Sequence, residues 1–385
     1  MKITPIKLLM ATPQLYFDIA ATTPIDKDVA SLINKINLEN FGNPSSIHST
    51  GQQSHNIIER SRISVSNILN CKSSEILFTS GGSESNNIIL KGLLSPKDHL
   101  ITSSYEHPSV LALSNELKEQ GIDVTYIKPN QDGLIEVEKI KEALKNNTKL
   151  VSIMYVNNEL GTINPINKIA EICHKNDVLF HTDAVQYAGK EKINLSNSKI
   201  DFLSIGAHKF YGPKGIGALY CKSGKKIYPL ISGGGQENGL RAGTENISSI
   251  AGMSLALEIA EENYENNRKT ILDLEKYFIN ALNTANINYR INGLNRIPGI
   301  LNITFFDVKG HSLLMNLDML GIAISYGSAC SSGSANAPLA LLEMGMPKDE
   351  ASCSVRISIG KMIKKDNIDK LVNSLSNIIL RAHKK

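Results

Sequence analysis

A lysine that follows a strand-like apolar run is the first residue with an evident chemical use. Lys209 lies in residues 201–215, which read DFLSIGAHKFYGPKG. Burial at the end of an interior strand disfavours the ammonium form of a lysine and lowers its pKa, and the neutral amine can form a Schiff base with a carbonyl compound. The segment therefore predicts a nucleophilic lysine at the carboxyl edge of a sheet.

A glycine-rich turn precedes an apolar helix-like stretch earlier in the chain. The turn contains Gly82 and Ser83 and leads into residues 88–94. Open backbone N–H groups, a hydroxyl and a helix N-terminus suit a phosphate group, although the same turn caps helices in many proteins. The sequence contains neither GxxxxGK[ST] nor a GxGxxG after a strand, which argues against P-loop and dinucleotide sites.

Further polar groups follow neighbouring apolar runs. His107 comes after residues 99–103, and Asp183 ends the run 178–182 with Gln186 three positions later. In open α/β sheets ligands bind outside the carboxyl ends of the strands, and a buried carboxylate there needs a cationic partner. A phosphate cradle, a Schiff-base lysine, a carboxylate for a pyridinium nitrogen and an imidazole that can stack on a ring together predict a pyridoxal phosphate pocket.

One cysteine has the surroundings of a reactive thiol. Cys330 lies in residues 325–334, which read SYGSACSSGS and have no hydrophobic period. A thiol on such a loop is expected to be exposed and mobile. The other four cysteines fit structural positions, and their spacing contains no CxxC pair or zinc pattern, so no metal site is expected: Cys71, Cys173, Cys221 and Cys353.

An arginine near the C-terminus alternates with apolar residues. Strand alternation in residues 352–359 puts Cys353, Val355 and Ile357 on one face and Arg356 on the polar face. The planar guanidinium group of Arg356 could bind a substrate carboxylate through two hydrogen bonds. The alternative is that Arg356 forms an ordinary ion pair at the surface.

The elements around these groups are those of an α/β protein. Short apolar runs alternate with helical periodicities from about residue 55 to 260, which is typical of βα units and a mostly parallel sheet. A long helical segment, about 247–283, leads into a second unit with strands near 299–305 and 354–359 and a helix at about 365–383. The expected strands of the main sheet are 75–79, 99–103, 124–127, 150–156, 178–182, 200–205 and 217–221.

Length and charge set the remaining limits. With 385 residues the chain is expected to form two or three domains, and its net charge of +4 with mixed signs does not indicate nucleic-acid binding. The N-terminal region has only a four-residue apolar run, and no segment has the length of a secretory or membrane-spanning stretch. We therefore expect a cytoplasmic protein with no membrane association.

The motifs together resemble those of NifS/IscS-type cysteine desulfurases, pyridoxal phosphate enzymes of the class V aminotransferase group. The resemblance spans nearly the whole chain, and its cysteine motif resembles that of the branch with a long, mobile loop. It implies a type I fold, with a large cofactor-binding domain at 15–260 and a small α+β domain at 1–14 and 261–385 that carries the cysteine loop. The matching motifs are YFD at 16–18, ATTP at 21–24, GNPSSIH at 42–48, AHK at 207–209, YGPKG at 211–215, RAGT at 241–244, GSACSS at 327–332 and SVRISIG at 354–360.

The resemblance also implies roles for individual residues. Lys209 would carry the cofactor as a Schiff base, Asp183 would pair with its ring nitrogen, and Gln186 would contact its phenolic oxygen. His107 would stack on the ring. The phosphate would be held by Gly82, Ser83, His208 and Thr244, the last reaching the neighbouring subunit's cofactor in a homodimer.

Substrate handling is implied in the same way. Asn158 would orient the substrate beside the cofactor, Arg356 would bind the cysteine carboxylate, and Cys330 would carry the sulfur as a persulfide. Two departures concern the phosphate: Ser83 stands where the family usually has Thr, and Gly206 stands where it usually has Ser. The second change removes one hydrogen bond, so we expect weaker phosphate binding.

The expected reaction converts L-cysteine to L-alanine and passes sulfur to an acceptor protein, such as an iron–sulfur scaffold, or into thiolation. Three alternatives remain at this point: a selenocysteine lyase, a class V aminotransferase, and a non-catalytic protein that binds pyridoxal phosphate or a sulfur partner. An aminotransferase would have no use for Cys330, and Gly206 is the feature that favours a binding protein.

Overall fold

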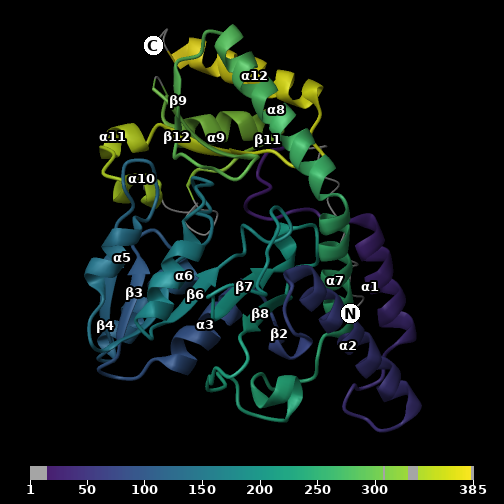
Figure 1. Ribbon diagram of the computed structural model, residues 1–385. Coiled ribbons are helices and arrows are strands. Elements are labelled where there is room, and N and C mark those ends of the chain that lie inside the picture. Colours follow the sequence, from purple (N-terminus) through teal and green to yellow (C-terminus); the bar gives the residue numbers. More distant parts are fainter. Residues whose placement is uncertain (1–14, 307, 328–336, 383–385) are drawn as a thin grey trace, which may run out of the picture.

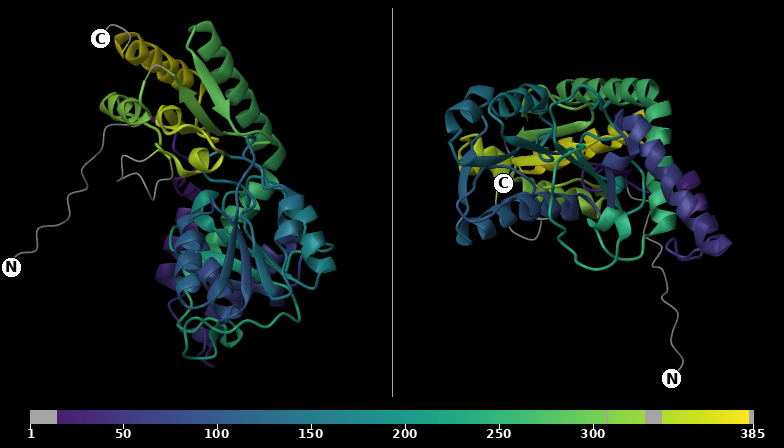
Figure 2. Two further views of the ribbon diagram at one scale, coloured as in Figure 1. Left: turned by 90° about the vertical axis from the view of Figure 1, so that its left-hand side faces the viewer. Right: turned by 60° about the horizontal axis from the view of Figure 1, so that its bottom comes forward.

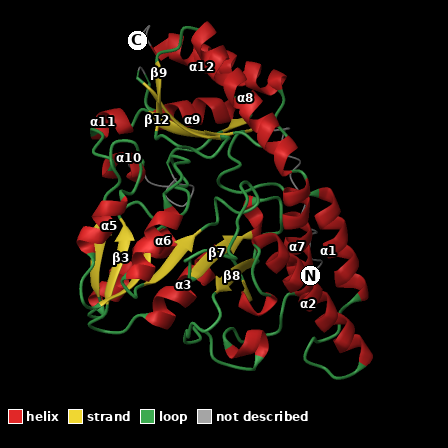
Figure 3. Cartoon of the chain, in the orientation of Figure 1, coloured by secondary structure: helices red, strands yellow, loops and turns green. Residues whose placement is uncertain are grey.

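The computed structural model describes residues 15–306, 308–327 and 337–382. A large lobe contains a seven-stranded sheet, and a smaller lobe above it in Figure 1 contains a three-stranded sheet. Figure 2 shows the same two lobes from two further sides, and Figure 3 separates their helices from their strands. The α/β class and the two sheets expected from the sequence are confirmed.

The large sheet is mostly parallel, as predicted. Only β8 runs antiparallel to its neighbours β2 and β7, and every other pairing is parallel. All seven predicted strands are present, with ends shifted by a few residues. In spatial order they are β2 (Ile76–Thr79), β8 (Gly217–Cys221), β7 (Phe202–Gly206), β6 (Leu179–Asp183), β5 (Thr148–Ser152), β3 (His99–Ser103) and β4 (Asp123–Ile127).

Helices cover both faces of this sheet, so its central strands are buried on both sides. Leu77 packs with one helical layer, whereas its neighbour Phe78 packs with the other. The first layer is formed by α3 (Gly82–Leu93) and α4 (Pro108–Glu119). The second contains α1 (Lys27–Glu39), α2 (Ser49–Leu69), α5 (Val137–Ala143), α6 (Ile166–Lys175) and α7 (Ile247–Glu262).

The small lobe has its own hydrophobic core. Its antiparallel sheet has the order β12-β10-β9, and β1 pairs in parallel with β11 beside it. The strands are β1 (Leu15–Tyr16), β9 (Tyr289–Asn292), β10 (Ile300–Phe305), β11 (Ile322–Ala323) and β12 (Ser354–Ser358). The helices of this core are α8 (Tyr264–Thr284), α9 (Gly310–Met319) and α12 (Lys365–Ala382). The short helices α10 (Leu339–Glu343) and α11 (Lys348–Ala351) instead pack their buried residues against the core of the large lobe.

The long helical segment predicted at 247–283 is two helices, α7 and α8, which meet at Asn263. The Asn263 side chain donates to the carbonyl of Ile259 at 2.9 Å, so an amide that competes for helix carbonyls ends α7. α7 packs on α1 and α2, whereas α8 packs on α12. We propose that the lobe boundary lies at this junction, close to the expected position after residue 260.

Two kinds of feature are absent from the residues that the structure describes. None of the helices in the described ranges is both long and apolar enough to span a membrane. The same ranges contain no cluster of three or more His, Cys, Asp or Glu side chains suited to a metal ion.

A buried ion pair fixes the loop that follows β8. Glu237, in η3 (Gln236–Gly239), accepts from Arg62 Nη1 at 2.8 Å and from Arg62 Nη2 at 2.7 Å. The Phe78 backbone N–H also donates to Glu237 at 2.8 Å. Both charged residues are less than 9% exposed, and Glu237 is the buried one of the two carboxylates that contact Arg62.

We predict that Glu237→Ala lowers the free energy of unfolding by roughly 3–5 kcal/mol, because it removes the buried carboxylate of the pair and leaves the Arg62 guanidinium with the exposed Glu59 as its carboxylate partner. Glu59→Ala is the matched control, since Glu59 also contacts Arg62 but is 41% exposed, and it should cost about 0–1 kcal/mol. Urea denaturation of both variants measures the difference. Equal losses would contradict this account of the pair.

Candidate active site

A cavity of about 270 Å³ lies at the carboxyl ends of β5, β6 and β7, where the α/β topology places ligand sites. Most of the side chains singled out from the sequence meet there, although they come from distant parts of the chain. The predicted site residues on its wall are Gly82, Ser83, His107, Asn158, Asp183, Gln186, His208, Lys209 and Arg356.

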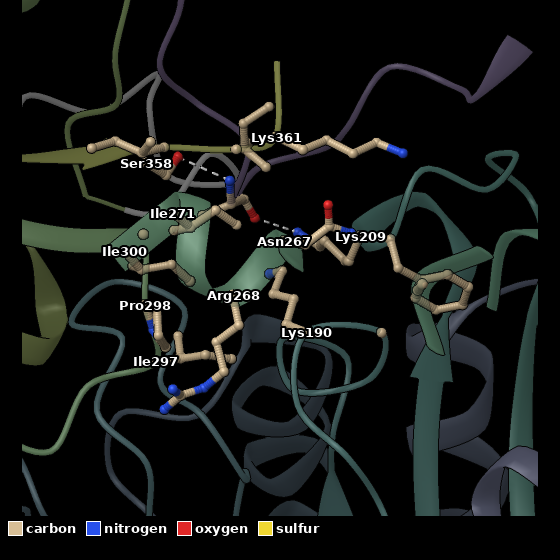
Figure 4. Close-up of a pocket in the computed structure, with 18 of the residues that line it drawn as sticks. Lys190, Lys209, Asn267, Arg268, Ile271, Ile297, Pro298, Ile300, Ser358 and Lys361 are labelled. Carbon is tan, nitrogen blue, oxygen red and sulfur yellow. Dashed lines mark hydrogen bonds between the residues drawn. The ribbon is translucent and has the colours of Figure 1, made fainter. Parts of the chain in front are cut away.

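Lys209 lies between this cavity and a smaller one. It ends η2 (Ala207–Lys209), the turn directly after β7, and its Nζ donates to the carbonyls of Ala20 at 2.7 Å and Ala21 at 2.8 Å. Figure 4 shows Lys209 on the wall of the smaller cavity, which has a volume of about 60 Å³. Two backbone carbonyls therefore hold the amine at the border of the larger cavity.

Lys190 is a second lysine of this region that the sequence reasoning missed. Its Nζ donates to Gln186 Oε1 at 2.6 Å, and Gln186 Nε2 in turn donates to the Ala20 carbonyl at 2.6 Å. Desolvation, followed by repulsion from Lys209 and Arg356, lowers the pKa of Lys190 to about 7. Its position four residues after Gln186 was the only available signal.

Asp183 and His107 lie together on the cavity wall. Asp183 is 6% exposed and accepts at both oxygens, from Asn86 Nδ2 at 2.7 Å and from the Val185 backbone N–H at 3.0 Å. His107 precedes α4, and its Nδ1 accepts from the Ser109 backbone N–H at 3.1 Å. Burial lowers the pKa of His107, while nearby Asp183 opposes that shift.

Gly82 and Ser83, at the start of α3, lie on the cavity wall where the sequence predicts a phosphate cradle. A Cβ atom at Gly82 would lie 2.4 Å from Val185 Cγ2, so Val185 would have to move to admit a larger residue. His208 lines the same cavity, and burial together with nearby lysines lowers its pKa to about 4, so its ring is neutral near pH 7. Gly206 lies behind the cradle with extended backbone angles, and a Cβ there would meet Gly82 N at an ordinary 3.6 Å.

Arg356 also lies on the wall of this cavity. It is 1% exposed, and it donates to Asp18 Oδ1 and to the Asn158 carbonyl, each at 2.7 Å. Its Nε has no hydrogen-bond partner among the described residues. The arginine is therefore buried at the cavity and does not form the surface ion pair considered as the alternative.

Two of the predicted residues in the described ranges do not line this cavity: Gly206 lies behind its wall, and Thr244 is exposed elsewhere. Cys330 lies outside the described residues. The remaining cysteines are free thiols. Burial raises the pKa of Cys71 and Cys173 to about 12 and that of Cys221 to about 11, so these three are protonated near pH 7. Cys353 is buried, as its strand face predicted.

The cavity wall fits pyridoxal phosphate, the cofactor predicted from the sequence. A buried carboxylate stands ready for a cationic ring nitrogen, an amine stands within the same cavity, and a glycine lets a helix N-terminus approach an anion.

Comparisons with known proteins cover almost the full chain. The family model described as aminotransferase class-V matches residues 15–371. The cysteine desulfurase IscS of Dictyoglomus turgidum is 42% identical over 372 residues, which cover 95% of this chain and 94% of that relative. A solved NifS-like protein is 34% identical with a TM-score of 0.89, covering 96% of this chain and 100% of that one. A structure of SspA in complex with cysteine is 37% identical with a TM-score of 0.81, covering 90% of this chain and 99% of that one.

A buried carboxyl group, that of Glu106, precedes His107 of the cavity wall. Glu106 Oε1 accepts from Ser103 Oγ at 2.5 Å and from the Met154 backbone N–H at 2.8 Å, and Glu106 is 3% exposed. Burial, with a smaller contribution from Asp183, raises the pKa of Glu106 from 4.5 to about 8. The folded chain therefore keeps a proton that the unfolded chain releases at lower pH.

We predict that this group makes the folded state less stable as the pH rises. Between about pH 4.5 and about pH 8 the folded state binds one more proton at Glu106 than the unfolded state, so unfolding becomes progressively easier. Glu106→Gln, which cannot titrate, should remove this component. Chemical denaturation of both proteins across that range measures it, and parallel pH profiles would contradict the prediction.

Proposed function

The chain belongs to the class-V aminotransferase family and, within it, to the NifS/IscS-type cysteine desulfurases, and on this premise we propose that its cavity removes sulfur from L-cysteine. The products are L-alanine and a persulfide on Cys330, whose sulfur passes to an acceptor protein for iron–sulfur cluster assembly or thiolation. The observation that carries this proposal is the convergence of Lys209, Asp183 and Arg356 on one cavity.

The cofactor of the proposed reaction is pyridoxal phosphate. Lys209 would hold it covalently, Asp183 would keep its ring nitrogen protonated, and Gln186 would contact its phenolic oxygen. His107 would lie on the ring face. The phosphate would be held by Gly82, Ser83 and His208, with Gly206 behind them and Thr244 from a second subunit. When bound, the cofactor withdraws electrons from the substrate Cα.

Arg356 would bind the substrate carboxylate. One side of its guanidinium is already used by Asp18 and the Asn158 carbonyl, and Nε has no partner among the described residues. A charge-assisted bond to a carboxylate would satisfy that buried donor. The Asn158 side chain lines the same cavity and would orient the substrate.

Lys209 and Cys330 carry the chemical steps. Lys209 removes the proton from the substrate Cα, and because the electron pair left there would be drawn off by the bound cofactor, Cβ can accept the electron pair of the Cβ–Sγ bond. The Cys330 thiolate then attacks Sγ: an S–S bond forms, the Cβ–Sγ bond breaks, and its electron pair stays on Cβ, which takes up a proton. Cysteine thereby becomes alanine, and the enzyme thiol becomes a persulfide. Cys330 must afterwards reach an outside acceptor.

A homodimer would complete the site. Thr244 is exposed, and its loop is fixed by Glu237 and by Arg241, whose Nε donates to Glu84 Oε1 at 2.9 Å near the start of α3. The exposed hydroxyl of such a fixed loop could donate a hydrogen bond to the cofactor phosphate in a neighbouring subunit. We place the dimer in the cytoplasm, with neither nucleic acid nor membrane as partner.

The test is the variant Cys330→Ser. It should bind pyridoxal phosphate as the parent protein does, but it should produce no alanine from L-cysteine, because serine cannot accept sulfur as a persulfide. Alanine formation under single-turnover and steady-state conditions, with absorbance of the bound cofactor, measures both properties. Unchanged alanine production would contradict the persulfide route.

Two further variants control this experiment. Cys221→Ser removes a thiol that burial keeps protonated, and it should leave alanine production intact. Lys209→Ala should lose both the absorbance of the covalently held cofactor and the activity. A selenocysteine lyase would keep its activity in Cys330→Ser when assayed with selenocysteine but would not turn over cysteine in the parent protein.

We also predict that Gly206→Ser strengthens cofactor binding. The extended backbone accepts a side chain without strain, the added Cβ meets no close neighbour, and a hydroxyl there lies beside the cradle. One added hydrogen bond to the phosphate should lower the dissociation constant by up to about tenfold. Absorbance titration of the cofactor-free protein measures this. Gly235→Ser, in open space away from the cavity, is the control, and equal affinities for both variants would exclude the proposed contact.

A further inference from the structure

Asn86 joins two groups of the site without touching the cavity itself. It lies in α3 and is fully buried. Its Nδ2 donates one hydrogen to Asp183 Oδ2 at 2.7 Å and one to Ser109 Oγ at 2.9 Å. Both hydrogens of the amide are therefore used.

Ser109 continues this chain of hydrogen bonds to the imidazole. Its Oγ lies 2.8 Å from His107 Nδ1. Because Oγ already accepts from Asn86, its own hydrogen is available to His107 Nδ1, which the Ser109 backbone N–H also approaches. A ring nitrogen that accepts hydrogen bonds carries no proton, so neutral His107 has its proton on Nε2.

The orientation of the Asn86 amide has only one workable solution. Turning it over would set Oδ1 against the carboxylate of Asp183, which is an acceptor. In the orientation present, Asn86 Oδ1 is buried and has no hydrogen-bond partner among the described residues. An unpaired buried acceptor destabilises the fold. The amide is therefore better explained by what it donates than by a gain in stability.

We propose that Asn86 and Ser109 are positioning residues that fix the Asp183 carboxylate and the neutral His107 imidazole relative to each other. The pair forms one continuous connection from β6 through α3 to the start of α4. These hydrogen bonds exist without a ligand, and only their consequence for the cofactor rests on the function proposed above. In that function, Asp183 would present an anion to the ring nitrogen of the cofactor, and His107 would present an uncharged imidazole to the face of the cofactor ring.

The groups around His107 act on it in opposite directions. Asp183, at the end of β6, favours the imidazolium, whereas Lys209 and His208, on the turn after β7, disfavour it. Hydrogen bonds donated to Nδ1 stabilise only the neutral ring. Removing the Ser109 hydroxyl should therefore raise the pKa of His107. Removing Asn86 should also raise it, because the released hydroxyl could turn and accept from a protonated Nδ1.

The test is an NMR pH titration of ¹⁵N-histidine in the full-length chain freed of cofactor, with the His107 signal assigned from its loss in His107→Gln. Ser109→Ala and Asn86→Ala should each raise the pKa of His107. The shift in the double variant should be smaller than the sum of the two single shifts, because part of the effect of Asn86 on His107 passes through Ser109. Ser109→Thr, which keeps the hydroxyl, should restore the parent value.

Ser114→Ala is the matched control, since it removes another buried hydroxyl of α4 that bonds only within its own helix. It should leave the His107 titration unchanged. An unchanged pKa in Ser109→Ala, additive shifts in the double variant, or no rescue by Ser109→Thr would each overturn the proposal. Ser109→Ala and Ser109→Thr keep the test decisive if Asn86→Ala does not fold.

A second measurement separates this proposal from the proposed function. Asn86→Ala should bind pyridoxal phosphate roughly two- to tenfold more weakly than the parent chain, the effect expected for one lost hydrogen bond to Asp183. Equal affinity would refute the connection to Asp183. If the parent chain itself bound no pyridoxal phosphate, the proposed function would fail, while the NMR titration would still decide the roles of Asn86 and Ser109.

Discussion

The carboxylate of Asp183, buried at the end of a central strand, is the constraint on which the site depends. A charge in that place is costly unless donors and a cation surround it. Asn86 Nδ2 and the Val185 backbone N–H supply the donors from within the fold. They do not supply a positive charge in contact with the carboxylate, and a cationic ligand is the natural way to complete the environment.

Positively charged side chains gather near the same cavity. Lys190, Lys209 and Arg356 lie close enough to affect one another, and their repulsion contributes to the lowered pKa of Lys190. Arg356 is paired with the carboxylate of Asp18 at 2.7 Å. Anionic groups of a ligand would interact favourably with this group of cationic side chains. Separated charges of opposite sign in one cavity suit a small zwitterionic substrate, which the modest net charge of the chain did not reveal.

The sequence predicted the framework well because buried parallel strands are continuous apolar runs, and Lys209, Asp183 and His107 follow three of them. The sequence did not predict roles that depend on contacts between residues far apart in the chain. Asn86 and Ser109 look like ordinary helix residues, and nothing local shows that Asn86 meets Asp183, 97 positions away. β9 was missed because four residues at the edge of a small sheet carry little pattern. The break at Asn263 was hidden by helical periodicity on both sides.

The division into two lobes gives the site its geometry. Arg356 comes from β12 of the small lobe, whereas Lys209 follows β7 of the large lobe, so the distance between the carboxylate clamp and the reactive amine depends on how the lobes sit together. The Asn158 carbonyl, from the large lobe, accepts from Arg356 at 2.7 Å and fixes that relation before any ligand arrives. An arginine held in this way loses little conformational freedom on binding. One of the contacts that join the lobes thus also prepares the substrate site, and we expect changes near this contact to act on catalysis through Arg356.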